Sequence, residues 1–318
     1  MTRVTMDTSS FSSFTPREPQ TDRPPREPAP PTPFISFIKP QGQLWNYNRH
    51  KTHEDQPGNI PKAFLDAMSV REKVYVEEQG VALENEFDSD DHRSCHWVIY
   101  ASVLTTIIPA ILDPRSGRLV RPRVTRTTSL PIGTLRLVPF PHSAHPRNGG
   151  IYLNGLLTNV GDPVRPRSSE TVQALQPQEI QGGNRRNSLY IRDFPTTFHN
   201  GQEPYVKLGR LAVLKEYRNK GIAGQLVRAA VTWMQTNYTI FNPSPSVLGF
   251  DRLGMDVTGQ LPKWRGLFCI HAQEEAVKVW ERYGFKVDEK MGKWWEEGIP
   301  HVGMWLRVPV GKGGHTVA

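Results

Sequence analysis

The clearest pattern of hydrophobic and polar positions lies in residues 205–234. Val206 to Leu214 is a mostly apolar run of strand length, and the six residues after it are polar and largely basic. Apolar residues then recur at helical spacing on one stripe, at Ile222, Leu226, Ala230 and Met234. The pattern predicts a strand, a short basic turn and a helix that opens at Gly221.

Shorter apolar runs on either side of this stretch predict the other elements. Alternating or continuous apolar runs bounded by turn residues indicate strands, and period-3.6 runs indicate helices. The expected strands are 34–38, 96–101, 132–138, 267–270, 285–287 and 301–306, and the expected helices are 61–77 and 274–283. Strands and helices interleave in this order, which is typical of a mixed α/β fold.

Polar stretches rich in proline and glycine interrupt the pattern. The chain of 318 residues holds 28 Pro and 26 Gly, and only 37% of its residues are hydrophobic. We interpret 1–33 as a disordered proline-rich tail, 309–318 as a flexible tail, and 34–308 as a single domain. The expected loop insertions are at about 103–130, 142–203 and 239–263. In the first, 103–112 is a candidate strand extension; the second is expected to be disordered rather than a second small domain.

Charge and cysteine content narrow the classes of function. The net charge is +8, but the basic residues are scattered among loops without interleaved aromatics, which argues against a nucleic-acid partner. No apolar run is long enough for a membrane span. Cys95 and Cys269 lack metal-type spacing, so no metal is expected. A cytoplasmic protein, with the nucleus as the alternative compartment, fits these features.

The turn before the predicted helix is a candidate anion site. Free N–H groups and the helix dipole favour negative charge at a helix N-terminus. Arg218 and Lys220 would add positive charge, and Gly221, Ala223 and Gly224 would let the backbone approach a phosphate closely. An ordinary strand–helix connection is the alternative at this point.

The residue order of the turn resembles a known family. Arg218-x-x-Gly221-x-Ala223 is similar to the R/Q-x-x-G-x-G/A pyrophosphate loop of the GNAT N-acetyltransferase superfamily. Three further segments resemble motifs of a GNAT subgroup: 71–96, with R-x-x-V-Y-V-x-E-Q-x-V, E-x-D and His; 271–285, like N-x-x-A-x-x-x-Y-x-x-x-G-F; and 296–304, like E-x-G-I-P-H-x-x-M. The resemblance implies a mixed central sheet whose central strands splay apart in a V, with helices on both faces.

The resemblance also implies a set of cofactor residues. Acetyl-CoA would be the co-substrate, and its pantetheine arm would lie along a strand that often carries a bulge. The implied cofactor residues are Leu211, Ala212 and Val213 for the arm and thioester, Arg218, Asn219, Lys220, Gly221, Ile222, Ala223 and Gly224 for the diphosphate, and Gln273, where the family usually has Asn.

The acid and the base are harder to assign. The family tyrosine that protonates the departing thiolate aligns with Trp280, and Tyr283 lies three residues on, so Tyr283 or solvent could take that role. Candidate bases are Glu78, His96, His271 and His301, with His301 favoured because it opens the last strand. The acidic residues after position 76 would favour a cationic amine: Glu77, Glu78, Glu84, Glu86, Asp88, Asp90 and Asp91.

The function expected from these features is an acetyl-CoA-dependent transfer of acetyl to the primary amine of a small molecule. A protein lysine or N-terminal acetyltransferase is the first alternative. A non-catalytic acyl-CoA-binding or scaffold protein is the second, prompted by Trp280 and the long polar segments. The sequence leaves the oligomeric state open.

Overall fold

The computed structural model describes residues 34–159, 193–242 and 263–310. The chain divides into a short N-terminal unit, 1–31, and a unit that spans 32–318, and the described residues all belong to the second. The predicted tail 1–33 and most of the predicted insertion 239–263 therefore lie outside the described residues, as do 160–192 and 311–318.

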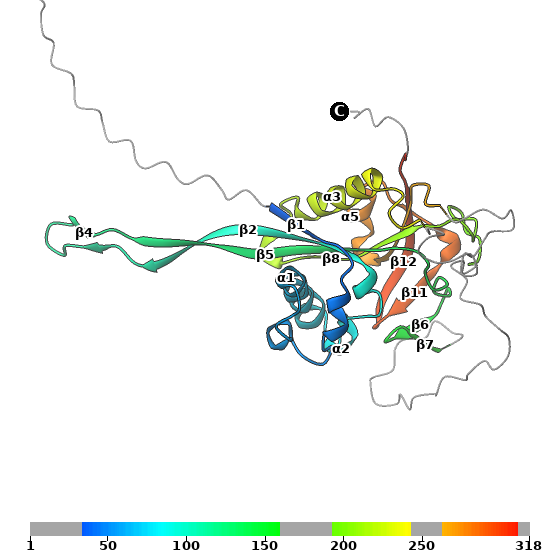
Figure 1. The fold of residues 1–318 in the computed structure, drawn as a ribbon, viewed down its shortest axis with the longest axis horizontal. Helices are drawn as coiled ribbons and strands as arrows, with labels where there is room; N and C mark the ends of the chain where they lie inside the picture. The colour runs from blue at the N-terminus through cyan, green and yellow to red at the C-terminus, as the bar shows by residue number, and fades with distance from the viewer. Residues whose placement is uncertain (1–33, 160–192, 243–262, 311–318) are drawn as a thin grey trace, which may run out of the picture. The chain divides into compact units, whose positions relative to one another are not determined.

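One mixed sheet forms the centre of this unit (Figure 1). Its strands lie in the order β1-β2-β5-β8-β9-β12-β11-β6-β7, with β10 paired to β12. The bounds of the strands are β1 Phe34–Ile38, β2 Cys95–Ile108, β5 Val124–Val138, β6 Ile151–Leu153, β7 Leu156–Asn159, β8 Val206–Val213, β9 Leu267–Gln273, β10 Lys286–Val287, β11 Lys293–Glu296 and β12 Ile299–Arg307. The first four strands of this order pair antiparallel, β8 and β9 pair parallel, and β9 and β12 pair antiparallel.

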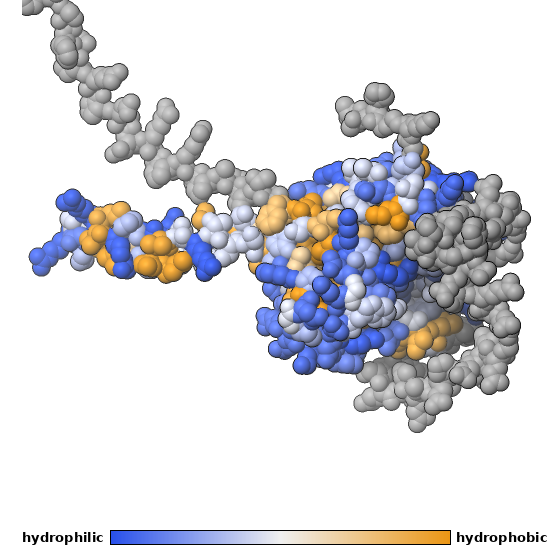
Figure 2. Space-filling view, in the orientation of Figure 1, coloured by the Kyte–Doolittle hydropathy of each residue, from blue (hydrophilic) through white to orange (hydrophobic). Residues whose placement is uncertain are grey.

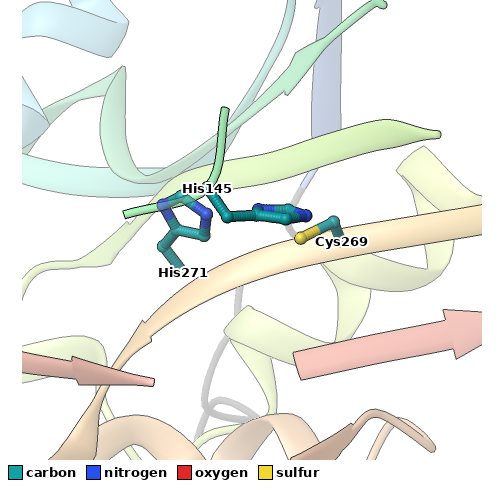
Figure 3. Close-up of side chains that lie close together, drawn as sticks. All are labelled: His145, Cys269 and His271. Carbon is teal, nitrogen blue, oxygen red and sulfur yellow. The ribbon is translucent and has the colours of Figure 1, made fainter. Parts of the chain in front are cut away.

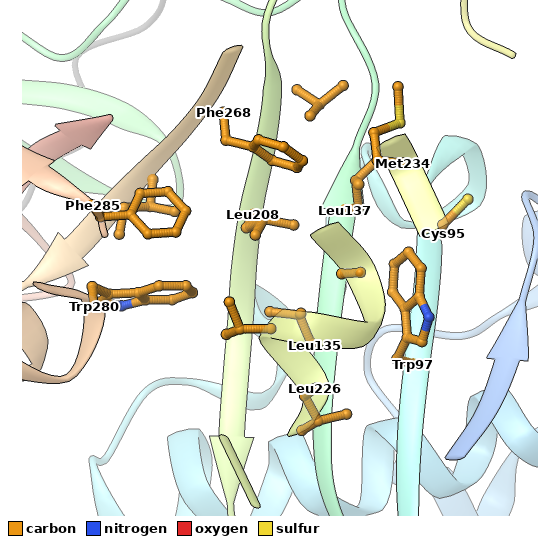
Figure 4. Close-up of a cluster of buried hydrophobic side chains, with 14 of the residues drawn as sticks. Cys95, Trp97, Leu135, Leu137, Leu208, Leu226, Met234, Phe268, Trp280 and Phe285 are labelled. Carbon is orange, nitrogen blue, oxygen red and sulfur yellow. The ribbon is translucent and has the colours of Figure 1, made fainter. Parts of the chain in front are cut away.

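Helices cover both faces of the sheet, as expected. The helix α3, Ile222–Thr236, packs its apolar stripe on β2 and β5, and Figure 4 shows Leu226 and Met234 among Trp97, Leu135 and Leu137. The short helix α5, Val277–Glu281, adds Trp280 to the same cluster. On the other face, α1, Lys62–Arg71, packs against Val98 and Tyr100 of β2. The predicted stripe of 222–234 is therefore confirmed as a core-facing surface.

The predicted helix 61–77 continues past α1 as a π-helical segment, Glu72–Glu78, labelled η3. A short helix, α2 at Leu83–Glu86, follows it. The predicted helix 274–283 is shorter than expected, because Glu274–Ala276 is a 3₁₀ turn and α5 ends at Glu281. All three differences concern the ends of elements, where hydrogen-bond patterns change within one turn.

The candidate strand extension at 103–112 is confirmed as far as Ile108, where β2 ends, but the rest of the expected loop insertion is largely strand. β2 and β5 continue to pair from Ala101↔Leu130 to Ile108↔Val124, beyond the neighbouring strands β1 and β8, as a two-stranded ribbon (103–130) tipped by β3, Ile111–Leu112, and β4, Leu119–Arg121. Because the ribbon covers no core, its strands need no alternation of apolar and polar residues. Figure 2 shows apolar side chains along it, and the exposed ones are Leu104, Ile107, Ile111, Leu112, Leu119, Val120, Val124 and Leu130.

The expectation of disorder over 142–203 is wrong for the parts that the structure describes. β6 and β7 form a hairpin, and β6 pairs parallel to β11, a strand that the sequence pattern did not predict. His142, His145 and His199 in the flanking segments are buried. These segments lack an apolar period of their own and are held by pairing and packing onto the end of the sheet.

Candidate active site

A β-bulge interrupts the strand β8 in the middle of the sheet. Gly209 lies opposite Arg136 of β5 and Ala212 opposite Thr134, so Arg210 and Leu211 together oppose one residue. Arg210 has a positive φ of 50°, which is uncommon for a side chain other than glycine. A bulge leaves backbone groups without ladder partners. The expectation of a bulge in this strand is confirmed. The bulge begins at Arg210, one residue before the expected segment 211–213.

The two parallel strands, β8 and β9, separate just before the bulge, on its N-terminal side. β8 and β9 pair only over Val206↔Phe268, Lys207↔Cys269 and Leu208↔Ile270, although β8 continues to Val213 and β9 to Gln273. The predicted splay between central strands is therefore present. It brings unpaired backbone of the bulge next to the opening between the strands.

The turn after β8 has the backbone conformation of an anion site. Asn219 and Gly221 both adopt left-handed φ values, 62° and 75°, and α3 begins at Ile222 without a capping side chain and without an acidic residue in its first turn. The first N–H groups of a helix have no partner within it. Alternating right- and left-handed residues point successive N–H groups into one concavity, which suits a phosphate.

Arg218 and Glu78, which were expected to have separate roles, form an ion pair. Arg218 Nη2 lies 2.6 Å from Glu78 Oε2, and Arg218 Nε donates to the carbonyl of Val213 at 3.0 Å. Both side chains are more than a third exposed, so solvent weakens the pair. The contact joins the end of η3 to the turn that follows β8.

The next residue in the chain makes the matching contact to β9. Gln79 and Gln273 pair their side-chain amides in both directions, at 3.1 and 3.0 Å. Glu78 and Gln79 together thus bridge from the turn after β8 to the end of β9, across the open end of the splay. Tyr75, one turn earlier, donates its hydroxyl to the Leu211 carbonyl at 3.0 Å, so the same segment also reaches the bulge.

His301 lies directly opposite Gln273 on the neighbouring strand β12. Its Nδ1 is 2.9 Å from the carbonyl oxygen of Ile299. If Nδ1 donates there, Nε2 is the nitrogen that accepts a proton. His271 lies two residues before Gln273 on the same side of β9, with Nδ1 3.4 Å from Glu296 Oε1, and burial lowers the pKa of His271 to about 4.

The two aromatic residues of the 271–285 segment have different surroundings. Trp280 is buried and packs on Phe285, so it belongs to the core. The hydroxyl of Tyr283 lies on Gly224 in the first turn of α3, and a Cβ at Gly224 would be only 2.9 Å from it. Gly224 therefore makes room for Tyr283, in addition to its expected role beside a phosphate.

The acidic residues after position 76 are mostly not free to bind a cation. Arg71 pairs with Glu86 and Asp91 at 2.5 and 2.7 Å. Asp88 pairs with Arg136 and Arg210 at 2.7 and 3.1 Å. Burial would raise the pKa of Asp91, but the adjacent guanidinium groups hold it well below its usual range. The expectation of an amine-binding acidic cluster is wrong for Glu86, Asp88 and Asp91, since arginines already neutralise them.

His96 belongs to the same buried network and not to the splay. Its Nε2 lies 3.0 Å from the Asp91 carbonyl oxygen, and burial lowers its pKa to about 4. Of the four candidate bases, therefore, Glu78 is ion-paired and His96 lies within the network, whereas His271 and His301 line up beside Gln273.

Comparison with known proteins finds one stretch that matches a family. Residues 188–242, which include β8, the basic turn and α3, match the family described as Acetyltransferase (GNAT) family. This stretch of the chain is similar to the GNAT acetyltransferase family. The mixed sheet with separating central strands is the architecture that the resemblance to GNAT acetyltransferases leads us to expect. No curated protein matched the chain.

Solved structures of three bacterial proteins are similar to this chain. A putative N-acetyltransferase from Lactobacillus plantarum is 18% identical, with 86% of this chain and 97% of that chain covered and a TM-score of 0.39. ElaA from Escherichia coli is 11% identical, with 86% and 99% covered and a TM-score of 0.38. An acyl-CoA N-acyltransferase from Pseudomonas aeruginosa is 16% identical, with 87% and 100% covered and a TM-score of 0.37.

Three residues at this site were not expected from the sequence. Gln79 meets Gln273, Arg210 forms the bulge and pairs with Asp88, and Tyr75 holds the bulge carbonyl. The contact of Tyr75 could have been anticipated, because the subgroup motif usually has phenylalanine at this position. Within the described part of the chain, no helix is long and apolar enough to cross a membrane.

Proposed function

We propose that the protein is an acetyl-CoA-dependent N-acetyltransferase that transfers acetyl to the primary amine of a small molecule. One observation carries this proposal: the bulge at Arg210–Leu211 lies beside the point where β8 and β9 separate, and the same chain continues into the left-handed Gly221 and the start of α3. A single stretch can therefore hold the thioester at the bulge and the diphosphate at the helix N-terminus.

In this proposal the donor is bound mainly by backbone. The pantetheine arm would lie along Leu211–Val213, and an N–H there would polarise the thioester carbonyl. The first-turn N–H groups of Ile222, Ala223 and Gly224 would bind the diphosphate, with Asn219 shaping the turn. Arg218 and Lys220 would add charge, and Gln273 would offer its amide.

The transfer itself needs a neutral amine. The amine nitrogen attacks the thioester carbon, the C–N bond forms, and the C–S bond breaks to release the CoA thiolate. His301 is the proposed base, because an Nδ1 donor bond to Ile299 leaves Nε2 to take the amine proton. Tyr283, or water in its place, would give the thiolate its proton. Glu78 would act by holding Arg218, with which it forms an ion pair.

A small acceptor is favoured by the bridge across the splay. The Gln79–Gln273 pair joins the segment after η3 to the end of β9, next to His301. An extended polypeptide would have to displace this contact to reach the bulge. A small amine could approach from beside it.

The activity test uses purified full-length protein, acetyl-CoA, a thiol reagent and a panel of polyamines, amino sugars, arylalkylamines and lysine peptides. Release of CoA with a small amine supports the proposal. Release with peptides alone would replace it by a protein acetyltransferase. Tight acetyl-CoA binding without release on any amine would instead indicate a binding module.

The donor site is tested by a matched pair of glycine variants. Gly221 and Gly117 both have positive φ, 75° and 65°, and open space where a Cβ would be, but Gly117 lies at the tip of the ribbon. Gly221→Val is expected to abolish acetyl-CoA binding in calorimetry, whereas Gly117→Val should retain it. Equal affinities in the two variants would contradict the proposed diphosphate site.

The proton-transfer roles are tested by His301→Gln and Tyr283→Phe. Loss of the base is expected to lower kcat by about 10²–10⁴-fold and remove the acidic limb of the pH profile. Tyr283→Phe is expected to lower kcat without changing that limb. An unchanged kcat for Tyr283→Phe would assign thiolate protonation to solvent.

A further inference from the structure

Two histidines and a cysteine from distant parts of the chain lie together at the base of the splay (Figure 3). His145 comes from the segment between β5 and β6, and Cys269 and His271 come from β9. One potential ligand atom of each residue lies within 4.8 Å of the corresponding atoms of the other two. We call these three residues the His145 cluster.

Three of the four ring nitrogens in this cluster have no hydrogen-bond partner. Both nitrogens of His145 and Nε2 of His271 are buried and accept or donate no hydrogen bond. The Cys269 thiol has only a 3.9 Å contact to the Ile270 carbonyl. Buried polar atoms are usually satisfied, because an unpaired one costs the free energy of its desolvation. Unpartnered atoms that converge in this way indicate a missing ligand.

A carboxylate lies beside the second nitrogen of each histidine. Asp193 Oδ2 is 3.3 Å from Nε2 of His145, and Glu296 Oε1 is 3.4 Å from Nδ1 of His271. Metal-bound histidines characteristically turn their other nitrogen toward a carboxylate, which fixes the ring and strengthens the ligand. The nitrogens left for a metal are then Nδ1 of His145 and Nε2 of His271.

The local charges also favour a divalent cation. A Cys269 thiolate and the carboxylates of Asp193 and Glu296 would supply three negative charges. A divalent ion and Lys207, which lies opposite Cys269 on β8, would supply three positive charges.

We propose that His145, Cys269 and His271 bind a zinc-type divalent transition-metal ion. Sulfur and imidazole donors with tetrahedral preference suit Zn²⁺. Zn–N and Zn–S bonds of about 2.1 and 2.3 Å place tetrahedral ligands roughly 3.3–3.6 Å apart, so the three side chains would move closer by about 1 Å on binding. The ion would tie the segments that carry His145 and Asp193 to the sheet, independently of the donor site.

The test starts with the full-length protein purified without chelator. Elemental analysis is expected to find about one zinc-type ion per chain, and after its removal Co²⁺ should bind with the absorption bands of a tetrahedral site that includes a thiolate. Cys269→Ser is expected to lose the thiolate band and most of the affinity. Cys95→Ser, which alters the other buried cysteine, should retain both.

A second variant keeps the test informative if Cys269→Ser fails to fold. Asp193→Asn removes the negative charge beside His145 but keeps an oxygen that can accept one of the two backbone N–H bonds, from His145 and Phe194, that the carboxylate accepts. It is expected to weaken Co²⁺ binding by about 10–100-fold while the thiolate band persists. Three outcomes would overturn the proposal: no binding of Zn²⁺ or Co²⁺ by the wild type, Co²⁺ binding without a thiolate band, or equal affinity in the wild type and Asp193→Asn.

Discussion

Two buried polar clusters lie on the same face of the sheet and have opposite chemistry. The Arg71 network, formed by Arg71, Glu86, Asp88, Asp91, Arg136 and Arg210, faces each charge with an opposite one. The His145 cluster holds two imidazoles and a thiol, and both ring nitrogens of His145 and Nε2 of His271 have no hydrogen-bond partner. The strand registers place Arg136, Lys207 and Cys269 on one face, so both clusters lie on the side of the sheet that α1 covers.

This difference separates a structural role from a binding role. A network that is already neutralised has nothing to offer a ligand, and its charges hold α1, β5 and the bulge together. A cluster with free donor atoms is incomplete until something binds. The acidic residues of the first cluster look like a cation site in the sequence, whereas the second cluster gives no sign there.

The largest effect is expected from breaking the Arg71 network. Arg71→Met leaves Glu86 and Asp91 buried without their main counter-charge, and loss of one partner of a buried pair costs about 3–5 kcal/mol. Urea unfolding measures this change. Lys62→Met, which breaks the exposed pair with Asp66, is the control and should alter stability little. Equal midpoints would show that the network contributes nothing to stability.

The second effect comes from filling the His145 cluster. A ligand that binds only the folded state at 100 times its Kd stabilises the protein by about 2.7 kcal/mol. Zn²⁺ is therefore expected to raise the midpoint of thermal unfolding of metal-free wild type and of Cys95→Ser. A similar rise in Cys269→Ser would point to binding elsewhere on the chain.

The third effect is a pH dependence of the free energy of unfolding. It comes from His96, which lies at the edge of the Arg71 network. Burial lowers its folded pKa to about 4 from 6.5, so between these values the unfolded chain binds a proton that the folded chain does not. The contribution of His96 to the free energy of unfolding is complete above pH 6.5. It decreases as the pH falls and is lower by about 2 kcal/mol at pH 5. Comparing wild type with His96→Gln in urea isolates this slope, and parallel pH profiles would refute the assignment.

The smallest effect on stability is expected from Tyr75, which joins η3 to the bulge. Tyr75→Phe removes the hydroxyl that bonds the Leu211 carbonyl and should cost about 0.5–1.5 kcal/mol. If this bond also fixes the bulge for the thioester, KM for acetyl-CoA should rise in the variant. Steady-state kinetics with a responsive amine measures it, and an unchanged KM would limit Tyr75 to stability.

Local patterns in the sequence predicted the elements that bury an apolar face. Val206–Val213 and Ile222–Thr236 were found because their periods match a strand and an amphipathic helix, and Gly221 was found because the turn requires it. The second strand of the ribbon, 124–130, and β11 were missed for the opposite reason. Neither buries a regular apolar face, so pairing with a partner strand, rather than local period, determines them.

The two clusters could not be predicted because they depend on tertiary contacts. Arg71, Arg136 and Arg210 come from one helix and two strands, and no local pattern shows which carboxylate each one meets. His145 and Cys269 are likewise too far apart in sequence for ligand spacing to reveal them. The residues of the donor site were easier to predict from the sequence, because a single strand–turn–helix segment contains most of them.

The ribbon offers a place to divide the chain. Its tip, Asp113–Arg118, is an exposed turn in which Asp113 accepts hydrogen bonds from the backbone of Arg115 and Ser116. The strands on either side pair from Cys95↔Leu137 to Ile108↔Val124, with register shifts after Ile99 and Thr106. A cut after Arg115 would therefore yield two fragments that remain associated, and the protein could be made as two co-expressed halves that reassemble through this ladder.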